Sequence, residues 1–275
     1  MIPVGFDYER PESLDAAIAL LAEHGEDATV LAGGHSLLPV MKLRLAAPEL
    51  VIDIGRLAEL SYIRVDGDAV AIGAATRYRD LVVSDVLAAE CALLPAVART
   101  VGDPQVRHRG TLGGALAHGD PAADLPAAVL ALDGTIVLRS PRGTRSVPIG
   151  EFYTGVFSSV KEPDELIVEI RLPRTGATGW AYEKFTRRSN DWAIVAVAVV
   201  TMPDGARHVG MVNMGSTPVR ATATERALAA GSSIEDAALR AAEGTDPPTD
   251  PHGTPEYRAH LARVLTRRAL TTATA

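Results

Sequence analysis

Two glycine pairs, each beside small polar side chains, are the part of this sequence best suited to binding chemistry. Gly33 and Gly34 end an apolar run and are followed by His35 and Ser36, in VLAGGHSLL at 30–38. Glycine has no Cβ, so its amide can approach a ligand closely, and successive amides curled around one point form an anion-binding nest. A helix beginning just afterwards would add free amides of its own. The first pair therefore predicts an anion site.

The second pair lies in GTLGGALAHGD at 110–120, where Thr111, Gly113 and Gly114 offer a similar turn. Two such nests suit an extended ligand with a pyrophosphate, such as a dinucleotide. Either stretch alone is more typical of an ordinary glycine-rich turn. Neither fits the P-loop or the G-x-G-x-x-G fingerprint, which disfavours a standard P-loop or Rossmann site. We expect valine at Gly33 and Gly114 to abolish ligand binding by filling the space beside the phosphates.

Composition restricts the class of protein. The chain has 275 residues, 47% of them apolar, and a net charge of -7, which argues against nucleic-acid binding. No apolar stretch approaches the roughly 20 residues that span a bilayer, and the start lacks a signal-peptide layout, so we expect a cytoplasmic protein. Cys91 is the only cysteine, which excludes a disulfide framework, a cysteine-based zinc site and an iron–sulfur cluster held by this chain.

The apolar patterns predict an α+β part of about 175 residues and a smaller C-terminal domain after the Gly/Thr-rich stretch 174–179. Helices are expected at 14–22, 79–89, 93–100, 126–132, 222–230, 234–242 and 255–270, with a short turn or helix at 37–45. Strands are expected at 29–32, 51–54, 62–65, 69–72, 135–139, 145–147, 165–172, 180–186, 193–202 and 208–213.

Two long motifs resemble the FAD-binding medium subunits of aerobic carbon monoxide dehydrogenases. They are AGGHSLLPVMKLRLAAPELVIDI (32–54) and DPQVRHRGTLGGALAHGDPAADLPA (103–127). The wider family comprises the flavoprotein subunits of molybdenum hydroxylases, related to the flavin domain of xanthine dehydrogenase. GWAYEKFTRRSNDWAIVAVA (179–198) and, more weakly, PEYRAHLARVLTRRAL (255–270) extend the resemblance over essentially the whole chain.

The resemblance implies a fold and a cofactor. The expected fold is an FAD-binding domain of the vanillyl-alcohol-oxidase type at 1–175, in two parts at about 1–55 and 56–175. A C-terminal flavoprotein domain at 176–275 would carry a three-stranded antiparallel sheet and helices. The residues that would wrap the FAD pyrophosphate are Ala32, Gly33, Gly34, His35 and Ser36. Those that would complete the phosphate and flavin cradle are Thr111, Leu112, Gly113, Gly114 and Ala115.

Four further residues match cofactor positions of the family. Asp124 matches an acid near the ribityl or adenosine part, the alternative being a helix N-cap. Ile167 matches a position that touches the nucleotide. Lys184 matches a lysine near the flavin ring, where a cation would stabilise the reduced anionic flavin; the alternative is a solvated strand lysine. Trp192 matches an aromatic near the isoalloxazine, the alternative being packing in the C-terminal sheet.

No catalytic side chain and no metal site are assigned, because His118 and Asp120 have no third ligand nearby. The resemblance implies that electrons pass from a molybdopterin-binding large subunit through a [2Fe–2S] small subunit to FAD. They would then reach a quinone, NAD or oxygen. The assembly would be a dimer of heterotrimers, cytoplasmic or held at the inner face of the membrane.

The sequence leaves three alternatives open. One is the flavin subunit of an N-heterocycle hydroxylase of the nicotine or purine type. Another is a self-sufficient flavoenzyme, for which Lys184, Arg187 and Arg188 are the obvious acid–base candidates. The last is a non-redox nucleotide-binding or scaffold subunit, which would be colourless when purified.

Overall fold

The N-terminal part is a small parallel sheet covered by one helix. In the computed structural model, which describes residues 1–273, strands β1 (Asp7–Glu9), β3 (Leu50–Asp53) and β2 (Ala28–Leu31) pair in that order. Helix α1 (Leu14–His24) begins where Ser13 Oγ accepts the amide of Ala16. The turn after β2 leads into α2 (Leu37–Lys42). Strand β1 was not predicted because its residues are all exposed and show no apolar pattern.

The middle part is a five-stranded antiparallel sheet. Its order is β4 (Ile63–Asp66), β5 (Ala69–Gly73), β10 (Leu166–Pro173), β6 (Thr135–Ser140) and β7 (Gly143–Pro148). The helices of this part are α3 (Tyr78–Val82), α4 (Asp85–Glu90), α5 (Leu93–Arg99), α6 (Pro104–Arg109), α7 (Leu112–His118), α8 (Asp124–Ala131) and α9 (Ile149–Phe152). A hairpin of β8 (Tyr153–Gly155) and β9 (Ser158–Ser159) precedes β10, and the 3₁₀ turns are η1 (Gly25–Asp27) and η2 (Ala58–Leu60).

One predicted helix of the middle part is wrong. The segment 79–89 forms α3 and α4 rather than one helix, because Ser84 Oγ accepts the amide of Leu87 and starts a new helix there. Helices α6 and α7 were not predicted, although they carry the second glycine motif. Asp103 caps the first turn of α6, and Thr111 caps that of α7. Aspartate and threonine are both favoured at the N-cap of a helix.

The C-terminal part has a four-stranded antiparallel sheet, so the expectation of three strands is wrong. The order is β11 (Gly179–Phe185), β12 (Val195–Thr201), β13 (Arg207–Val212) and β14 (Val219–Arg220). Strand β14 has two residues, too few to show a strand period. Helices α10 (Thr222–Ala229), α11 (Ile234–Ala238) and α12 (Pro255–Thr272) follow, α11 ending before the predicted 242.

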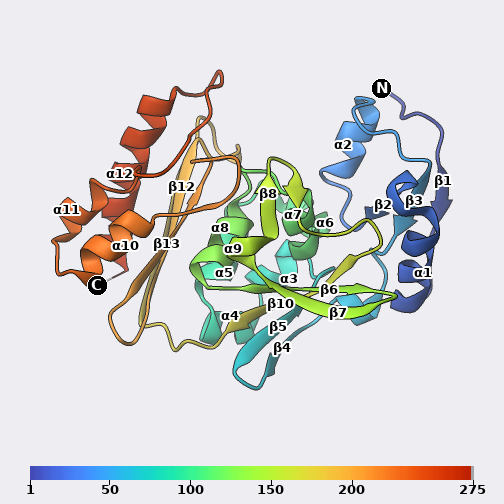
Figure 1. Ribbon diagram of the computed structural model, residues 1–275, viewed down its shortest axis with the longest axis horizontal. Coiled ribbons are helices and arrows are strands. Elements are labelled where there is room, and N and C mark those ends of the chain that lie inside the picture. Colours follow the sequence, from blue (N-terminus) through green and yellow to red (C-terminus); the bar gives the residue numbers. More distant parts are fainter. Residues whose placement is uncertain (274–275) are drawn as a thin grey trace.

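Strand β12 lies in the interior between two layers of helix. Every residue of VAVAVVT is buried. Val195, Val197 and Val199 pack into the core shared with α12, whereas Ala198 and Val200 belong to the core of the middle part, on the side of α8. This alternation has the two-residue period of a strand. Figure 1 shows the resulting order of layers, with α12, the C-terminal sheet, α8 and the middle sheet side by side.

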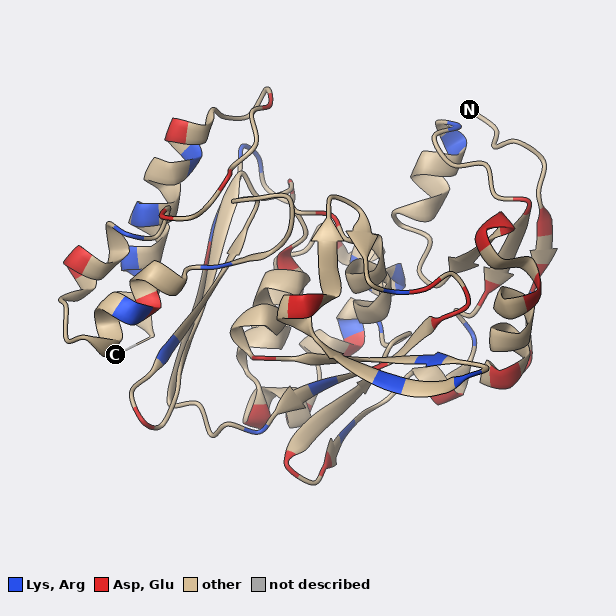
Figure 2. Ribbon diagram, viewed as in Figure 1, with Lys and Arg blue, Asp and Glu red and all other residues tan. Residues whose placement is uncertain are grey.

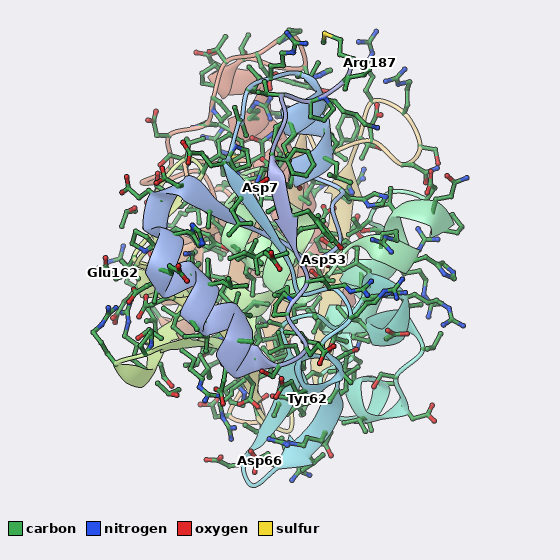
Figure 3. The ribbon with its side chains drawn as sticks, turned by 90° about the vertical axis from the view of Figure 1, so that its right-hand side faces the viewer. Asp7, Asp53, Tyr62, Asp66, Glu162 and Arg187 are labelled. Carbon is green, nitrogen blue, oxygen red and sulfur yellow. The ribbon has the colours of Figure 1, made fainter. Side chains whose placement is uncertain are left out.

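The surface mixes charges of both signs. Lysines and arginines alternate with acidic residues in the view of Figure 2, and acidic residues gather on α1 and the strands next to it. Figure 3 looks onto this side, with Asp7 on β1 and Asp53 at the end of β3. No helix within residues 1–273 is long and apolar enough to cross a membrane.

Candidate cofactor-binding site

A cavity of about 360 Å³ lies where three distant segments of the chain meet. These segments are the turn after β2, the start of α7 and the start of β10, which lie near one another in Figure 1. The predicted site residues that line the cavity are Ala32, Gly33, Gly34, His35, Ser36, Thr111, Gly113, Gly114, Ala115 and Ile167. The fold therefore brings both glycine motifs to one cavity.

The first glycine turn presents a row of free amides. Within the described chain, the amides of Gly33, Gly34, His35 and Ser36 donate to no protein acceptor. Gly34 has φ +78°, a backbone conformation that side-chain-bearing residues rarely adopt. His35 Nδ1 lies 3.3 Å from the Gly33 carbonyl oxygen and supports the turn locally. Unpaired amides at a cavity wall are binding groups for an anion.

The structure gives a further reason for glycine at position 33, besides the predicted approach of its amide to a ligand. A Cβ at this position would lie 2.2 Å from the carbonyl oxygen of Arg109, at the end of α6. The missing side chain therefore lets the first turn pack directly on the backbone that leads into the second turn.

The second glycine turn is not a second nest. The amide of Gly113 donates to Ala74 O at 2.8 Å, and that of Ala115 donates to Thr111 O at 3.0 Å. Thr111 Oγ1 accepts the amide of Gly114 at 3.2 Å. A Cβ at Gly113 would lie 2.6 Å from the Ala74 side chain. This turn thus shapes the cavity and packs α7 against the end of β5, while the amides of Gly113, Gly114 and Ala115 already donate to protein acceptors.

Three more predicted site residues, Leu112, Ala115 and Ile167, differ in whether and how they line the cavity. Leu112 is fully buried in the core of the middle part and does not line the cavity. Ala115 lines the cavity, and its side chain offers only a methyl group. Ile167 lines it at a β-bulge in the pairing of β10 with β6, a distortion that commonly redirects side chains beside binding sites.

Asp124 and Lys184 form a buried ion pair away from the cavity lining. Lys184 Nζ lies 2.8 Å from Asp124 Oδ2, and their side chains are 10% and 3% exposed. Tyr182 OH donates to the other carboxylate oxygen at 2.5 Å, and Lys184 also donates to Thr100 O at 3.3 Å. Burial raises the pKa of Asp124, whereas Lys184 and Tyr182 act in the opposite direction.

This pair settles the two alternatives considered for its members. Asp124 does not cap α8, whose N-cap is Ala123 with no side-chain hydrogen bond, and Lys184 is not a solvated strand lysine. Both carboxylate oxygens of Asp124 are occupied by protein donors. The pair joins α8 to β11 and thus the middle part to the C-terminal sheet.

Trp192 lies in the segment between β11 and β12 and is 60% exposed. Packing of the indole in the C-terminal sheet is therefore excluded. Trp192 is not among the residues that line the cavity. An exposed indole is free to stack on a planar ligand.

The cavity has lining residues that sequence reasoning missed. Tyr78, Lys161 and Glu165 contribute to it, together with the apolar side chains Leu21, Val30, Val40, Ile54 and Leu166. Lys161 could have been noticed, because it stands in SVKEPDELI just before a strand already assigned to the site. His118 also lines the cavity, and burial lowers its pKa. Among residues 1–273, no group of three or more acidic, histidine or cysteine side chains could hold a metal ion.

The lining fits a dinucleotide with a flavin. The free amides offer donors, which a diphosphate can satisfy because its oxygens are acceptors. The apolar side chains nearby suit flat ring systems, as in most cofactor sites.

Comparison with known proteins identifies the family. A family model described as the FAD binding domain in molybdopterin dehydrogenase matches residues 4–175, and one described as the CO dehydrogenase flavoprotein C-terminal domain matches 180–273. The carbon monoxide dehydrogenase medium chain of Hydrogenophaga pseudoflava is 41% identical over 99% of this chain and 98% of its own. The 6-hydroxypseudooxynicotine dehydrogenase complex subunit alpha of Paenarthrobacter nicotinovorans is 37% identical over 98% and 95%.

A solved structure agrees over the full length. It is carbon monoxide dehydrogenase from Hydrogenophaga pseudoflava lacking the Mo-pyranopterin moiety of its cofactor, with a TM-score of 0.95, 43% identity, and coverage of 100% of this chain and 99% of that one. Both glycine motifs and all of the C-terminal sheet except Gly179 fall within the matched regions. The chain thus belongs to the flavoprotein subunits of the molybdopterin dehydrogenase family, with an FAD-binding domain followed by a carbon monoxide dehydrogenase-type C-terminal domain.

Proposed function

We propose that this chain binds FAD in the cavity and serves as the flavin subunit of a carbon monoxide dehydrogenase-type molybdenum hydroxylase. The observation that carries the proposal is the row of free amides at Gly33–Ser36, facing a cavity within a chain similar to such subunits over its full length. Bound FAD would supply the redox chemistry, accepting electrons from partner clusters and passing them to an external acceptor.

The chain's own residues would bind and orient the cofactor. The amides of Gly33, Gly34, His35 and Ser36 would hold the diphosphate, and Thr111 and Gly113 would keep the second turn close to it. Ile167 would contact the nucleotide.

We assign Lys184 an electrostatic role toward the flavin ring. Its ammonium is held by Asp124, so Asp124 acts by positioning Lys184 rather than by accepting a hydroxyl of the ribityl or ribose. For Trp192 we propose stacking on the isoalloxazine, which its exposure permits.

Electron delivery would depend on partner subunits. With Cys91 as its only cysteine, this chain cannot ligate a [2Fe–2S] cluster through cysteines. We propose a [2Fe–2S] small subunit and a molybdopterin-binding large subunit as partners, in a dimer of heterotrimers at the cytoplasmic side. The large subunit would choose the substrate.

We further propose that residues 1–55 and 56–175 are the two parts of a vanillyl-alcohol-oxidase-type FAD domain, followed by the C-terminal domain at 176–275. Separate cores around α1 and around the middle sheet support two parts, and Leu57, Leu60, Ala75 and Leu166 of the second part complete the core around α1. The cavity lies between those two parts, because its lining comes from both.

The test uses the assembled complex from the native host, kept without oxygen. Carbon monoxide should bleach the flavin absorption of the complex and leave that of the isolated FAD-loaded chain unchanged. Bleaching by an N-heterocycle but not by carbon monoxide would assign the chain to that class of hydroxylase. Bleaching of the isolated chain by either compound would show a self-sufficient flavoenzyme and contradict the proposal.

A further inference from the structure

The loop between β9 and β10 brings a cation to the cavity. Among the residues of the described chain that line the cavity, Lys161 is the only lysine or arginine. The other chargeable groups there are His35, His118, Glu26 and Glu165. The family motifs do not include Lys161, and the amides of the first turn carry only partial charges.

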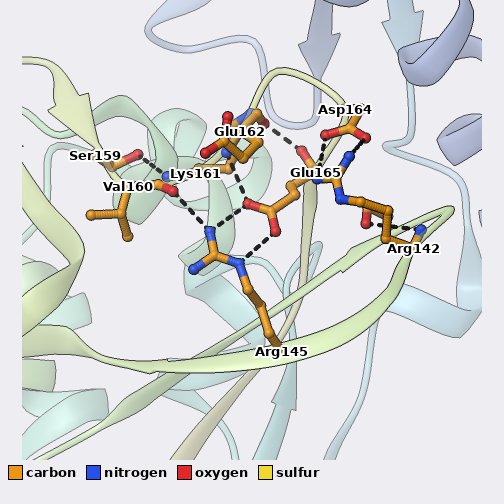
Figure 4. Close-up of polar contacts among 9 residues, drawn as sticks. Arg142, Arg145, Ser159, Val160, Lys161, Glu162, Asp164 and Glu165 are labelled. Atoms are coloured by element: carbon orange, nitrogen blue, oxygen red, sulfur yellow. Dashed lines mark hydrogen bonds and ion pairs between the residues drawn. The ribbon is translucent and has the colours of Figure 1, made fainter.

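Two arginines of the β6–β7 hairpin hold this loop in place, as Figure 4 shows. Arg145 Nε and Nη2 donate to the two carboxylate oxygens of Glu165 at 2.6 and 2.7 Å, and Nη2 also donates to Val160 O at 2.8 Å. Arg142 pairs with Asp164 through both of its terminal nitrogens. The charge of Glu165, whose side chain is 4% exposed, is therefore balanced by Arg145.

The folded loop fixes the ammonium of Lys161 through its own backbone. Lys161 Nζ donates to Glu162 O at 2.9 Å and to Glu165 O at 3.2 Å. An ammonium has three N–H donors, so one remains without a partner among the described residues. Three carboxylates lie near this ammonium. Glu162 is exposed, while Asp164 and Glu165 are paired with arginines.

A partly desolvated ammonium with a spare donor favours an anionic partner. Burial lowers the pKa of Lys161, although the nearby carboxylates of Glu165, Asp164 and Glu162 act in the opposite direction. The anionic groups of FAD are its two phosphates. Positive side chains and backbone amides commonly share the binding of a diphosphate.

We infer that Lys161 binds the diphosphate of FAD as the cationic partner of the Gly33–Ser36 amides. In the same inference, Arg145 is a positioning residue that acts through Glu165. This assignment rests on the proposed binding of FAD, and it adds a charged ligand that the family motifs do not contain.

The experiment measures FAD binding to the full chain after removal of its flavin, by flavin fluorescence at low and high salt. Lys161→Gln and Lys161→Met should each weaken binding about tenfold at low salt and reduce its salt dependence. Lys161→Arg should retain most of the affinity. The control is Arg267→Met, at an exposed position of α12, a helix that lies far from α7 and β2 in Figure 1. It makes the same charge change and should bind FAD like wild type.

Arg145→Met should also weaken FAD binding, but it should add little in the Lys161→Met background, because both act through one ammonium. The inference fails if either neutral Lys161 variant binds FAD like wild type. It also fails if the loss is equal at all salt concentrations and matches a loss of stability of the flavin-free chain. If wild type binds no FAD, the proposed function fails first, and that outcome is distinct from the others.

Discussion

Gly33 and the carbonyl oxygen of Arg109 are in direct contact across the two glycine motifs. A Cβ built at Gly33 would lie 2.2 Å from that oxygen. The first turn, with its free amides, is thereby fixed against the segment that opens α7. The close packing of the two turns therefore requires glycine at position 33.

Gly33→Ala should therefore destabilise the fold and, as a consequence, weaken flavin binding. The methyl group must displace backbone, so we expect a loss of about 1–3 kcal/mol of unfolding free energy and loss of retained flavin. Chemical unfolding and flavin content measure the two effects. Gly155→Ala is the control, because a Cβ there meets nothing within 4 Å and the backbone is not left-handed. Gly33→Ala with wild-type stability would contradict the observed contact.

Breaking the Asp124–Lys184 pair should be costly. Lys184→Met leaves a buried carboxylate without its cation, which typically costs about 3–5 kcal/mol. Asp124→Leu combined with Lys184→Met should cost less than the sum of the single changes, since neither charge is then stranded. Thermal unfolding of the three variants checks this. The control is Arg188→Ala, which breaks an exposed pair with Asp191 and should change stability by less than about 1 kcal/mol. A loss of stability in Lys184→Met no larger than that in Arg188→Ala would contradict the role of the buried pair.

Glu165 gives the chain a pH-dependent contribution to stability. Burial opposes its ionisation, yet the hydrogen bonds from Arg145 and the Glu162 amide hold the pKa of Glu165 below its ordinary value of 4.5. A depressed folded pKa means that the stabilisation is complete above the ordinary value and is lost as the pH falls through the folded one.

The difference in unfolding free energy between wild type and Glu165→Gln should thus be largest near neutral pH and shrink below about pH 4.5. Urea unfolding across this range measures it. Asp15→Asn, in an exposed pair with Arg139, is the control and should show a small difference throughout. A Glu165→Gln difference that stays constant with pH would contradict the assigned role of the charge.

Trp192→Ala should show whether the indole stacks on the flavin or packs within the protein. Because the indole is 60% exposed, its loss should change stability by about 0.5 kcal/mol or less. If it stacks on the flavin, the fluorescence of bound flavin should rise when the indole is removed. Trp180→Ala, on β11, should leave the flavin signal unchanged. A destabilised Trp192→Ala protein with unchanged flavin emission would reject the stacking proposal.

Sequence reasoning located the glycine turns because the lack of a Cβ is a local property visible in the chain. It missed a second reason for glycine at position 33, because Arg109 lies far along the sequence and only the fold brings the two residues together. The same limit explains why two nests were expected. The acceptors that occupy the second set of amides include Ala74 O, which no local pattern reveals.

The charged groups were harder to predict than the turns. Asp124 and Lys184 were both assigned to the cofactor, but their pairing depends on α8 packing against β11. Lys161 stands just before a strand already assigned to the site, but the loop that carries it is held by Arg145 from another hairpin, which no local pattern reveals. Strand β14 was missed because two residues cannot show a period.

A crystal structure of the full chain grown with FAD tests the central claim most directly. We expect diphosphate oxygens within about 3.2 Å of the amide nitrogens of Gly33–Ser36, so that those amides have acceptors. Density that places the diphosphate away from this turn, or amides that stay without acceptors while FAD is bound, would contradict it.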